Sequence, residues 1–420
     1  MNHLIRKNKI LLISPHSPLS INSGAGQRTR LIYNTLQINN DVDLFLISDP
    51  ADQDKVLLIK HFNLVACKPI SPYGTRRYYR FFRHFSPWIV DRIAYHSLAS
   101  KVELGIDDKL SNVLTGIFEK KRYDFIVARY LKSASLTNAF QHAPVLVDID
   151  DLDIEVWQSR LGISGDSLFR KLLMHRYLNS LNKEFPKLIH RTNGVWVAKS
   201  SDLQKVIHQN IAVLPNIPYH YAIDDNIRYP LPWGKDNQTI IIVASLGWAP
   251  NKDGLNFFLE NIWPLVIARL PDANLKIIGS GLDEETKARW SEILRVDVLG
   301  FVENIVPYYQ HASFSIAPLY HGGGTNIKVL ESLSYGRPCV CSTHAARGFE
   351  DVEGLYVCES ADIFAKACLK LLKNREECVQ KGHAGFEYVN YHFTYSVFQK
   401  AVNHVLYNTD VVDELGGGLY

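Results

Sequence analysis

Short runs rich in Ile and Val alternate along the chain with longer segments in which apolar residues recur at helical spacing. Apolar runs without polar alternation are typical of strands buried on both faces of a parallel sheet that helices cover. A first series of strands is predicted at residues 9–14, 42–48, 124–128, 144–149 and 194–198. A second series is predicted at residues 239–246, 273–278, 296–299, 313–317, 338–342 and 354–357. Helices are predicted between most strands, for example at residues 26–38, 252–269, 283–294, 326–335 and 361–373.

A proline-rich stretch, residues 214–234, separates the two series of strands. Proline lacks a backbone N–H and therefore ends helices and interrupts central strands, so we interpret this stretch as an interdomain linker. The pattern predicts an α/β protein of two doubly wound, Rossmann-like domains that face each other across a cleft, where two substrates can bind. The N-terminal domain would cover residues 1–215 and the C-terminal domain residues 216–392, with a last helix at about 393–408 packing back on the N-terminal domain.

The composition narrows the class of protein. The chain has 420 residues, of which 46% are apolar, so it can bury a large core and global disorder is excluded. Lys plus Arg total 46 and Asp plus Glu total 43, which gives a net charge of only +3. A nucleic-acid-binding protein would carry a strong basic excess, so we expect no nucleic-acid partner. The 6 cysteines show no CxxC pair and no Cys/His ligand spacing, which argues against structural zinc and fits a reducing compartment.

No apolar run approaches the ~18–20 residues that a membrane-spanning helix needs. The apolar stretch 9–14 is short and runs into a Ser-Pro pair, so we interpret it as a first strand and expect a cytoplasmic protein. A helix over residues 76–88 would place Arg76, Arg80 and Arg83 on one side and aromatic residues on the other. This pattern is typical of an interfacial helix on anionic lipid, here at the inner face of the membrane, and also of an ordinary amphipathic helix packed on the N-terminal domain.

The segment 317–333 carries the strongest chemical signal. A predicted strand ends, three glycines follow at residues 322–324, and a predicted helix begins. Glycines let the backbone approach a ligand closely and direct several N–H groups at it, and the helix N-terminus adds a partial positive charge. Lys328 and Glu331 lie three residues apart and share one helix face. This layout predicts a phosphate at the glycines and a sugar hydroxyl at Glu331; a tight turn with a surface Lys–Glu pair is the alternative.

The same segment resembles the donor-site signature of the family-4 retaining glycosyltransferases, which have the GT-B fold, and it is most similar to the subgroup that reads GGGxxxKxLE. Three flanking segments agree with that family. They are 336–343, which resembles a G-x-P-V-V-x-T run, 275–281, which resembles an L-x-I-x-G-x-G strand, and 298–302, which resembles an L-G-F-V turn. The resemblance is strong over about 239–350, moderate over 390–408, and weaker over 9–45 and 141–155.

The resemblance implies that the C-terminal domain binds a nucleotide diphosphate sugar, the donor, and that the N-terminal domain binds the acceptor. Glu331 matches the glutamate that holds the ribose of the donor nucleotide, and Lys252 matches a lysine that contacts the diphosphate. The loop that meets the donor sugar and the diphosphate corresponds to Gly322, Gly323, Gly324, Thr325 and Asn326.

Further matches are implied on both domains. Phe301 and Val302 lie where members of the family contact the base through the main chain. Gly24 and Gly26 match a glycine loop that follows the first strand. Asp150 aligns with a position near the reacting sugar that is often His in the family.

Two departures from the family pattern concern the donor sugar. Most members carry a second glutamate eight residues before Glu331, where this chain has Gly323, as in the triple-glycine subgroup. Most also carry Arg where this chain has Trp248. We expect Lys328 to supply the missing positive charge, an inference from charge alone.

Residues 148–153 contain two Asp-x-Asp patterns. In a different glycosyltransferase fold, Asp-x-Asp with a divalent metal holds the donor diphosphate. Here the glycine loop, a helix terminus and lysines already supply positive charge, so we predict no metal and no cofactor beyond the donor substrate. The aspartates are interpreted either as helix caps at a strand end or as residues near the acceptor or the reacting sugar.

Other chemistries receive no support from the sequence. The pair of glycines at Gly279 and Gly281 is followed by Glu284 where a dinucleotide-binding fingerprint requires a third glycine, and the segment 23–28 fails the same pattern. No Walker lysine and no Gly-x-Ser-x-Gly elbow occurs in the chain.

The sequence thus predicts a glycosyltransferase that moves a sugar from a nucleotide diphosphate sugar to a hydroxyl of a glycan or lipid-linked saccharide, in cell-surface polysaccharide or lipopolysaccharide biosynthesis. The resemblance implies retention of anomeric configuration without a metal. Backbone N–H groups with Lys252 and Lys328 would stabilise the leaving diphosphate. Two alternatives stay open: a non-catalytic binding subunit derived from such enzymes, and another GT-B enzyme such as a phosphorylase or an epimerase.

Overall fold

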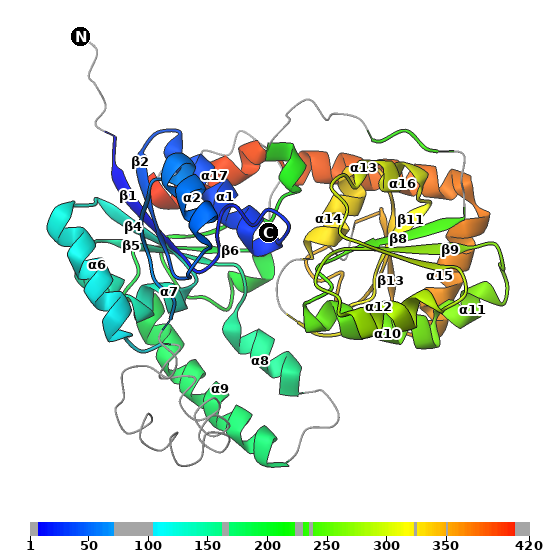
Figure 1. The fold of residues 1–420 in the computed structure, drawn as a ribbon, viewed down its shortest axis with the longest axis horizontal. Coiled ribbons are helices and arrows are strands. Elements are labelled where there is room, and N and C mark those ends of the chain that lie inside the picture. Colours follow the sequence, from blue (N-terminus) through cyan, green and yellow to red (C-terminus); the bar gives the residue numbers. More distant parts are fainter. Residues whose placement is uncertain are drawn as a thin grey trace, which may run out of the picture. The chain divides into compact units, whose positions relative to one another are not determined.

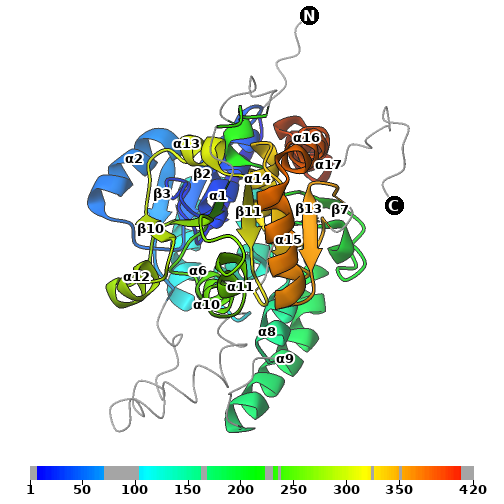
Figure 2. The same ribbon diagram turned by 90° about the vertical axis from the view of Figure 1, so that its right-hand side faces the viewer.

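The computed structural model describes residues 7–70, 104–161, 168–222, 230–234, 238–322, 326–349 and 352–407. The chain divides into two compact units. The first comprises Met1–Pro215 and Phe398–Tyr420, and the second comprises Asn216–Val397. Each unit contains one parallel β-sheet with helices packed against it (Figures 1 and 2). The prediction of two doubly wound α/β domains is therefore confirmed.

The first unit is built on a seven-stranded sheet with the order β3-β2-β1-β4-β5-β6-β7. Its strands are β1 (Lys9–Ser14), β2 (Asp41–Leu46), β3 (Leu64–Cys67), β4 (Phe125–Arg129), β5 (Val145–Ile149), β6 (Gly194–Val197) and β7 (Ile211–Val213). Its main helices are α1 (Gly24–Gln37), α2 (Asp52–Phe62), α6 (Asp108–Lys120), α7 (Leu131–Leu136), α8 (Asp153–Leu161) and α9 (Leu168–Ile189). The strand order reverses between β1 and β4, and ligands bind at the carboxyl ends of strands at such a switch point.

The two faces of this sheet follow from the alternation of side chains along each strand. Leu11 and Ile13 on β1 belong to one apolar cluster with residues of α6, α7 and α9. Ile10 and Leu12 are equally buried but point to the opposite face. Both faces of β1 are therefore covered, which explains why its sequence shows no polar alternation.

The second unit is built on a six-stranded sheet with the order β10-β9-β8-β11-β12-β13. Its strands are β8 (Thr239–Val243), β9 (Asn274–Ile278), β10 (Val296–Gly300), β11 (Phe314–Ala317), β12 (Cys339–Ser342) and β13 (Leu355–Cys358). Its main helices are α10 (Ala249–Asn261), α11 (Trp263–Ile267), α12 (Glu284–Ser291), α13 (Val306–His311), α14 (Ile327–Ser334), α15 (Ala361–Lys373) and α16 (Arg375–His392). The order reverses between β8 and β11, so the switch point of this unit lies at the loops that follow these two strands.

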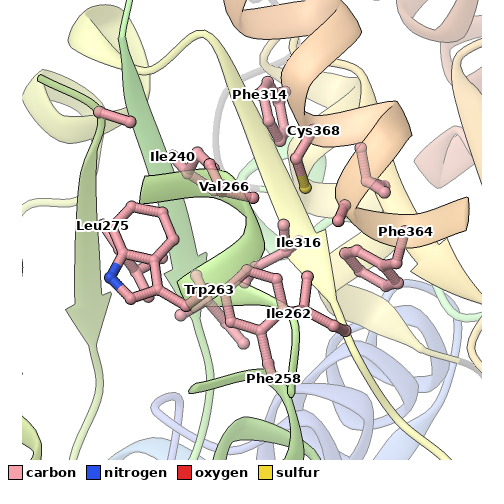
Figure 3. Packing of buried hydrophobic residues seen from close by; sticks show 14 of the residues in the cluster. Ile240, Phe258, Ile262, Trp263, Val266, Leu275, Phe314, Ile316, Phe364 and Cys368 are labelled. Carbon is pink, nitrogen blue, oxygen red and sulfur yellow. The ribbon is translucent and has the colours of Figure 1, made fainter. Parts of the chain in front are cut away.

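The core of the second unit forms between its sheet and the helices α10, α11, α12 and α15. Figure 3 shows Ile240 and Phe314 from the strands beside Trp263 from α11 and Phe364 from α15, all of them at most 1% exposed. Burying a side chain of this size contributes about 1.5–3 kcal/mol relative to leaving it in water. A separate cluster on α14 and α16, which includes Leu330, packs with residues of β11 and β12. The site loops are thus held by a sheet packed on both faces.

The last helix is α17 (Tyr395–Tyr407), and from Phe398 onward it belongs to the first unit. The Trp196 indole N–H donates to the Ala401 carbonyl at 2.9 Å, and Asn210 donates to the Val405 carbonyl at 2.9 Å. A Cβ at Gly194 would lie 2.5 Å from the side chain of Val405, so glycine at the start of β6 permits this close packing.

The predicted elements differ from the structure in a few places. The helix predicted at 252–269 is two helices, α10 and α11, because Pro264 has no N–H to continue the hydrogen-bond ladder. The strands β3 and β7 were not predicted, since they are only 4 and 3 residues long and half-buried or exposed at the sheet edges. The basic segment 76–88 lies outside the described residues. Within the described ranges, no helix combines the length and the apolar character needed to cross a membrane.

Candidate functional site

The switch point of the second unit is shaped by hydrogen bonds between loops at the carboxyl ends of its strands. The N–H of Ala244, just after β8, donates to the Ile278 carbonyl at the end of β9 at 3.0 Å. The N–H of Leu246 donates to the Ser280 carbonyl at 2.8 Å. The N–H of Gly279 donates to the carbonyl of Gly300, the last residue of β10, at 2.8 Å. Three successive loops therefore form one bonded surface along this edge.

Gly279 and Gly281 are required by this loop packing. Gly279 has φ +147°, and a Cβ there would lie 1.7 Å from the Ala244 carbonyl oxygen. Gly281 has φ +88°, and a Cβ there would lie 2.8 Å from the backbone nitrogen of Gly247. These φ angles and short distances leave no room for a side chain at either position. Loop packing therefore explains both glycines of the Gly-Ser-Gly segment without a bound dinucleotide.

The first glycine of the triple-glycine loop lies against an aromatic ring. Gly322 has φ +112°, and a Cβ there would lie 2.7 Å from Cη2 of Trp248. Trp248 precedes α10 and is 38% exposed, so its ring is open to solvent beside this backbone. Gly323, Gly324 and Thr325 lie outside the described residues.

The carbonyl of Gly322 accepts a hydrogen bond from an arginine on the loop after β12. Arg347 Nη2 donates to this oxygen at 3.2 Å, and His344 Nε2 lies 3.1 Å from it. Arg347 Nη2 also lies 2.9 Å from His344 Nε2. A guanidinium only donates, so Nε2 accepts in that contact and Arg347 is the donor to Gly322. Sequence reasoning missed both residues, because no spacing pattern links 322 to the region of 344–347.

The helix α14 presents the predicted donor residues. The Asn326 amide, before its first turn, donates to the Ala345 carbonyl at 2.9 Å, so this side chain has a structural partner. Lys328 and Glu331 are half-buried on the helix. Burial lowers the pKa of Lys328 to about 8. Burial raises the pKa of Glu331 to about 7, although a hydrogen bond from the Tyr309 hydroxyl and the charge of Lys328 oppose this shift.

The other residues predicted to contact the donor, Lys252, Phe301 and Val302, also lie on the second unit. Lys252, on α10, forms an ion pair with Asp283, which also caps α12 by accepting from the Thr286 N–H at 2.8 Å. A diphosphate would have to compete with that carboxylate for Lys252. Phe301, after β10, is 56% exposed, whereas Val302 packs against an apolar cluster that contains Tyr309.

The switch point of the first unit contains a buried group of charges from three elements. Arg28 on α1 donates to Asp148 on β5 through Nε at 3.0 Å and Nη2 at 2.6 Å. Arg129, the last residue of β4, also donates to Asp148. All three side chains are at most 1% exposed. Burial would raise the pKa of Asp148, but the two guanidinium groups hold it below its ordinary value.

Asp150 lies at the rim of this group and is 13% exposed. One carboxylate oxygen is 3.4 Å from Arg129 Nη2 and the other is 3.9 Å from Arg28 Nε. Two buried guanidinium groups against one carboxylate carry an excess positive charge, which Asp150 balances. Neither Arg28 nor Arg129 belongs to a sequence motif, so the sequence did not predict that they form part of a site.

Two aromatic residues border this rim. Tyr130 has φ +68°, a left-handed conformation that costs a bulky residue about 1–3 kcal/mol and that clusters at functional sites. Its ring lies 4.8 Å below the guanidinium carbon of Arg129 and 5.7 Å from the ring of His16. Burial and the charge of Arg129 lower the pKa of His16. The rim therefore combines a carboxylate with aromatic and imidazole groups at the carboxyl ends of β1, β4 and β5.

The glycine loop expected at Gly24 and Gly26 is in the structure the first turn of α1. Ser23 caps this helix by accepting from the Gly26 N–H at 3.2 Å. A Cβ at Gly26 would lie 2.2 Å from the Ser20 carbonyl oxygen, so the preceding turn demands glycine here. The expectation of a loop is corrected, because the Ser23 cap starts the helix at Gly24, two residues before the start at residue 26 that the apolar pattern predicted.

The remaining aspartates of the 148–153 segment have separate environments. Both oxygens of Asp148 are bound by arginines, and burial together with the charges of Asp150 and Asp153 raises the pKa of Asp151 to about 8. Among the described residues, no group of three or more His, Cys, Asp or Glu is placed to hold a metal ion.

Comparison with solved structures defines the class of fold. The chain is similar to a sucrose-phosphate synthase from Thermosynechococcus elongatus, with a TM-score of 0.67, 16% identity, and 96% of this chain and 99% of that chain covered. It is similar to Anabaena HepE in complex with UDP, with a TM-score of 0.61, 14% identity, and 96% and 100% covered. At these identities the likeness shows the fold, which is that of GT-B glycosyltransferases.

Comparison at the sequence level concerns mainly the second unit. Residues 237–374 match the family described as glycosyl transferases group 1. An uncharacterized glycosyltransferase of Haemophilus influenzae is 29% identical over 154 residues, which are 34% of this chain and 42% of that protein. An uncharacterized 44.6 kDa protein in the cps region of Klebsiella pneumoniae is 21% identical over 281 residues, which are 60% of this chain and 66% of that protein. The chain thus spans less than two thirds of each relative, and the family match and the fold together support a glycosyltransferase.

Proposed function

We propose that this protein transfers a glycosyl group from a nucleotide diphosphate sugar to a hydroxyl of a glycan or lipid-linked saccharide. The observation that carries the proposal is that the half-buried Lys328 and Glu331 lie on the helix that follows the switch-point strand β11 and Gly322, inside the segment that matches glycosyl transferases group 1. The donor is assigned to the second unit and the acceptor to the first.

The chemistry of the donor follows from these groups. A half-buried carboxylate accepts hydrogen bonds from vicinal hydroxyls, so Glu331 is assigned to the ribose. The N-terminus of α14 and Lys328 stabilise negative charge as the diphosphate departs. Lys252 joins them once the diphosphate displaces Asp283. That the structure of Anabaena HepE contains UDP supports a nucleotide as the ligand of this fold.

We further propose that transfer retains anomeric configuration. We also propose that it requires no metal, because lysines and backbone N–H groups offset the diphosphate charge. Asp150, held at the rim of the first unit, is assigned to the region of the reacting sugar. We assign no residue as a covalent nucleophile.

The acceptor is proposed to belong to cell-surface polysaccharide or lipopolysaccharide synthesis at the inner face of the membrane. The relative from the cps region of Klebsiella pneumoniae supports this role. The segment 76–88, with its arginines and aromatic residues, is proposed as the peripheral membrane contact.

The test is thermal stabilisation of the purified protein by UDP, GDP, ADP, CMP and NAD, with and without a chelator. A ligand at 100 times its Kd adds about 2.7 kcal/mol of stability. We expect stabilisation by one nucleoside diphosphate, preserved in the chelator and lost in Glu331→Ala and Lys328→Ala. Stabilisation by NAD alone, or by none of the five, would overturn the proposal. Incubation of the matching sugar nucleotide with saccharide acceptors then separates transfer from epimerisation and from binding without turnover.

A further inference from the structure

A tyrosine from a neighbouring helix is bonded to Glu331. The Tyr309 hydroxyl, on α13, donates to Oε1 of Glu331 at 3.0 Å. Tyr309 is 1% exposed and comes from the segment between β10 and β11, whereas Glu331 follows β11. The bond therefore ties together α13 and α14, the helices that precede and follow β11 in the chain.

The Tyr309 hydroxyl is fixed in place from several sides. Its ring packs on Tyr335 at 4.7 Å, and Tyr335 in turn stacks on His220 at 4.5 Å with an interplanar angle of 12°. The Tyr309 carbonyl accepts from Arg337 Nε at 2.8 Å, and Arg337 is fully buried. Ring and backbone are both immobilised, so the hydroxyl is preorganised for its acceptor.

The bond occupies one oxygen of the Glu331 carboxylate and favours its ionised form. A phenol donates strongly to a carboxylate and weakly to a protonated carboxyl. Burial and the nearby Glu331 raise the pKa of Tyr309 well above its ordinary value, so the phenol keeps its proton. Among the described residues, the charged and titratable groups that interact with Glu331 are Lys328 on its own helix, which also favours the ionised form, Tyr309, and Tyr335.

We propose that Tyr309 is a positioning residue of the donor site: its hydroxyl fixes the orientation and ionisation of Glu331, whose second oxygen then receives the ribose hydroxyls of the donor. This proposal rests on the proposed function. Tyr309 does not contact the donor and acts through Glu331.

The test compares Tyr309→Phe with Tyr335→Phe by calorimetric titration with UDP, GDP or ADP, whichever stabilises the wild-type protein most. A hydrogen bond to a charged group is worth about ten-fold or more in an equilibrium constant. We expect Tyr309→Phe to weaken nucleotide binding about ten-fold and to raise the pH at which binding is half-maximal. Tyr335→Phe, in the same ring stack, keeps the bond and should stay within about two-fold of wild type.

Glu331→Gln removes the charged acceptor of the Tyr309 hydroxyl and leaves the packed rings of Tyr309 and Tyr335 unchanged. It therefore tests the bond between Tyr309 and Glu331 without altering the ring packing. In the Glu331→Gln background, Tyr309→Phe should add less than about two-fold, because the two residues act as one unit. Equal losses from Tyr309→Phe in both backgrounds, or no loss in either, would overturn the positioning role. An unchanged nucleotide affinity in Glu331→Gln would instead overturn the donor-site assignment itself, which keeps the two failures distinguishable.

Discussion

The ring of Trp248 lies so close to Gly322 that a Cβ at residue 322 would stand 2.7 Å from it. These residues come from the loops after β8 and β11, the two strands at the switch point of the second sheet. Tryptophan here replaces the arginine expected from the family pattern, and the backbone beneath it is held by Arg347 instead. The apolar ring and the bonded carbonyl together fix where the glycine loop begins.

Gly322→Ala tests this relationship. We expect a loss of about 1–3 kcal/mol in the free energy of unfolding, because alanine is strained at φ +112° and its methyl group meets the Trp248 ring. Nucleotide affinity should fall with it. Urea denaturation and calorimetric titration measure the two effects.

The matched control is Gly116→Ala on α6, where a Cβ meets nothing within 4 Å. That change should stabilise the protein by about 0.5–1 kcal/mol, as expected for glycine in a helix interior. If Gly322→Ala behaved like Gly116→Ala, the close packing at the glycine loop would be refuted.

Arg347→Ala should weaken nucleotide binding by about ten-fold, since it removes a charged donor from the Gly322 carbonyl. Arg347→Lys should restore little of it, because a lysine ammonium has no second nitrogen to replace Arg347 Nε, which donates to the His344 carbonyl at 3.2 Å and orients the guanidinium. Titration with the selected nucleotide measures both variants.

Arg295→Ala serves as the control in the same unit, since the Arg295 side chain forms an exposed ion pair with Asp272. We expect its nucleotide affinity to match the wild type. Equal affinities in Arg347→Ala and Arg295→Ala would contradict a role for Arg347 at the glycine loop.

The sequence predicted the sheets well because their signal is local. The strands at 9–14 and 339–342, buried on both faces, are visible as apolar runs. The helix at 361–373 was predicted with its observed limits, since Ser360 caps it and its apolar spacing is regular. β7 has only 3 residues and none of them is fully buried, so it is too short to show a pattern and was missed.

Site contacts between distant segments could not be predicted. Arg28, Arg129 and Asp148 meet only because α1, β4 and β5 converge at one sheet edge. The bond between Tyr309 and Glu331 likewise depends on how two helices flank β11. The family pattern located Glu331 but did not show which side chain binds it. Only the tertiary structure identifies Tyr309 as that partner.

Nucleotide affinity should depend on pH with a maximum between about 7 and 8. Burial raises the pKa of Glu331 to about 7, so below that value the carboxylate gains a proton and loses an acceptor for the ribose. Burial lowers the pKa of Lys328 to about 8, so above that value the ammonium loses its charge and its attraction for the diphosphate. Titration of the nucleotide from pH 6 to 9 measures both limbs. Glu331→Gln should flatten the acidic limb only, and an unaltered acidic limb would show that another group titrates there.

Substitutions at Asp148 and Asp150 should distinguish an effect on folding stability from an effect on turnover. Asp148→Ala leaves Arg28 and Arg129 buried with one partly exposed carboxylate between them, which should cost about 3–5 kcal/mol of unfolding free energy. Asp150→Asn keeps the shape of the side chain at a position that is 13% exposed, so it should cost less than half as much. If Asp150 lies near the reacting sugar, Asp150→Asn should instead lower kcat by at least about ten-fold, since a fixed negative charge next to developing positive charge is lost. Denaturation and initial rates on the same preparations test both statements. Wild-type kcat in Asp150→Asn would confine this residue to a structural role beside the two arginines.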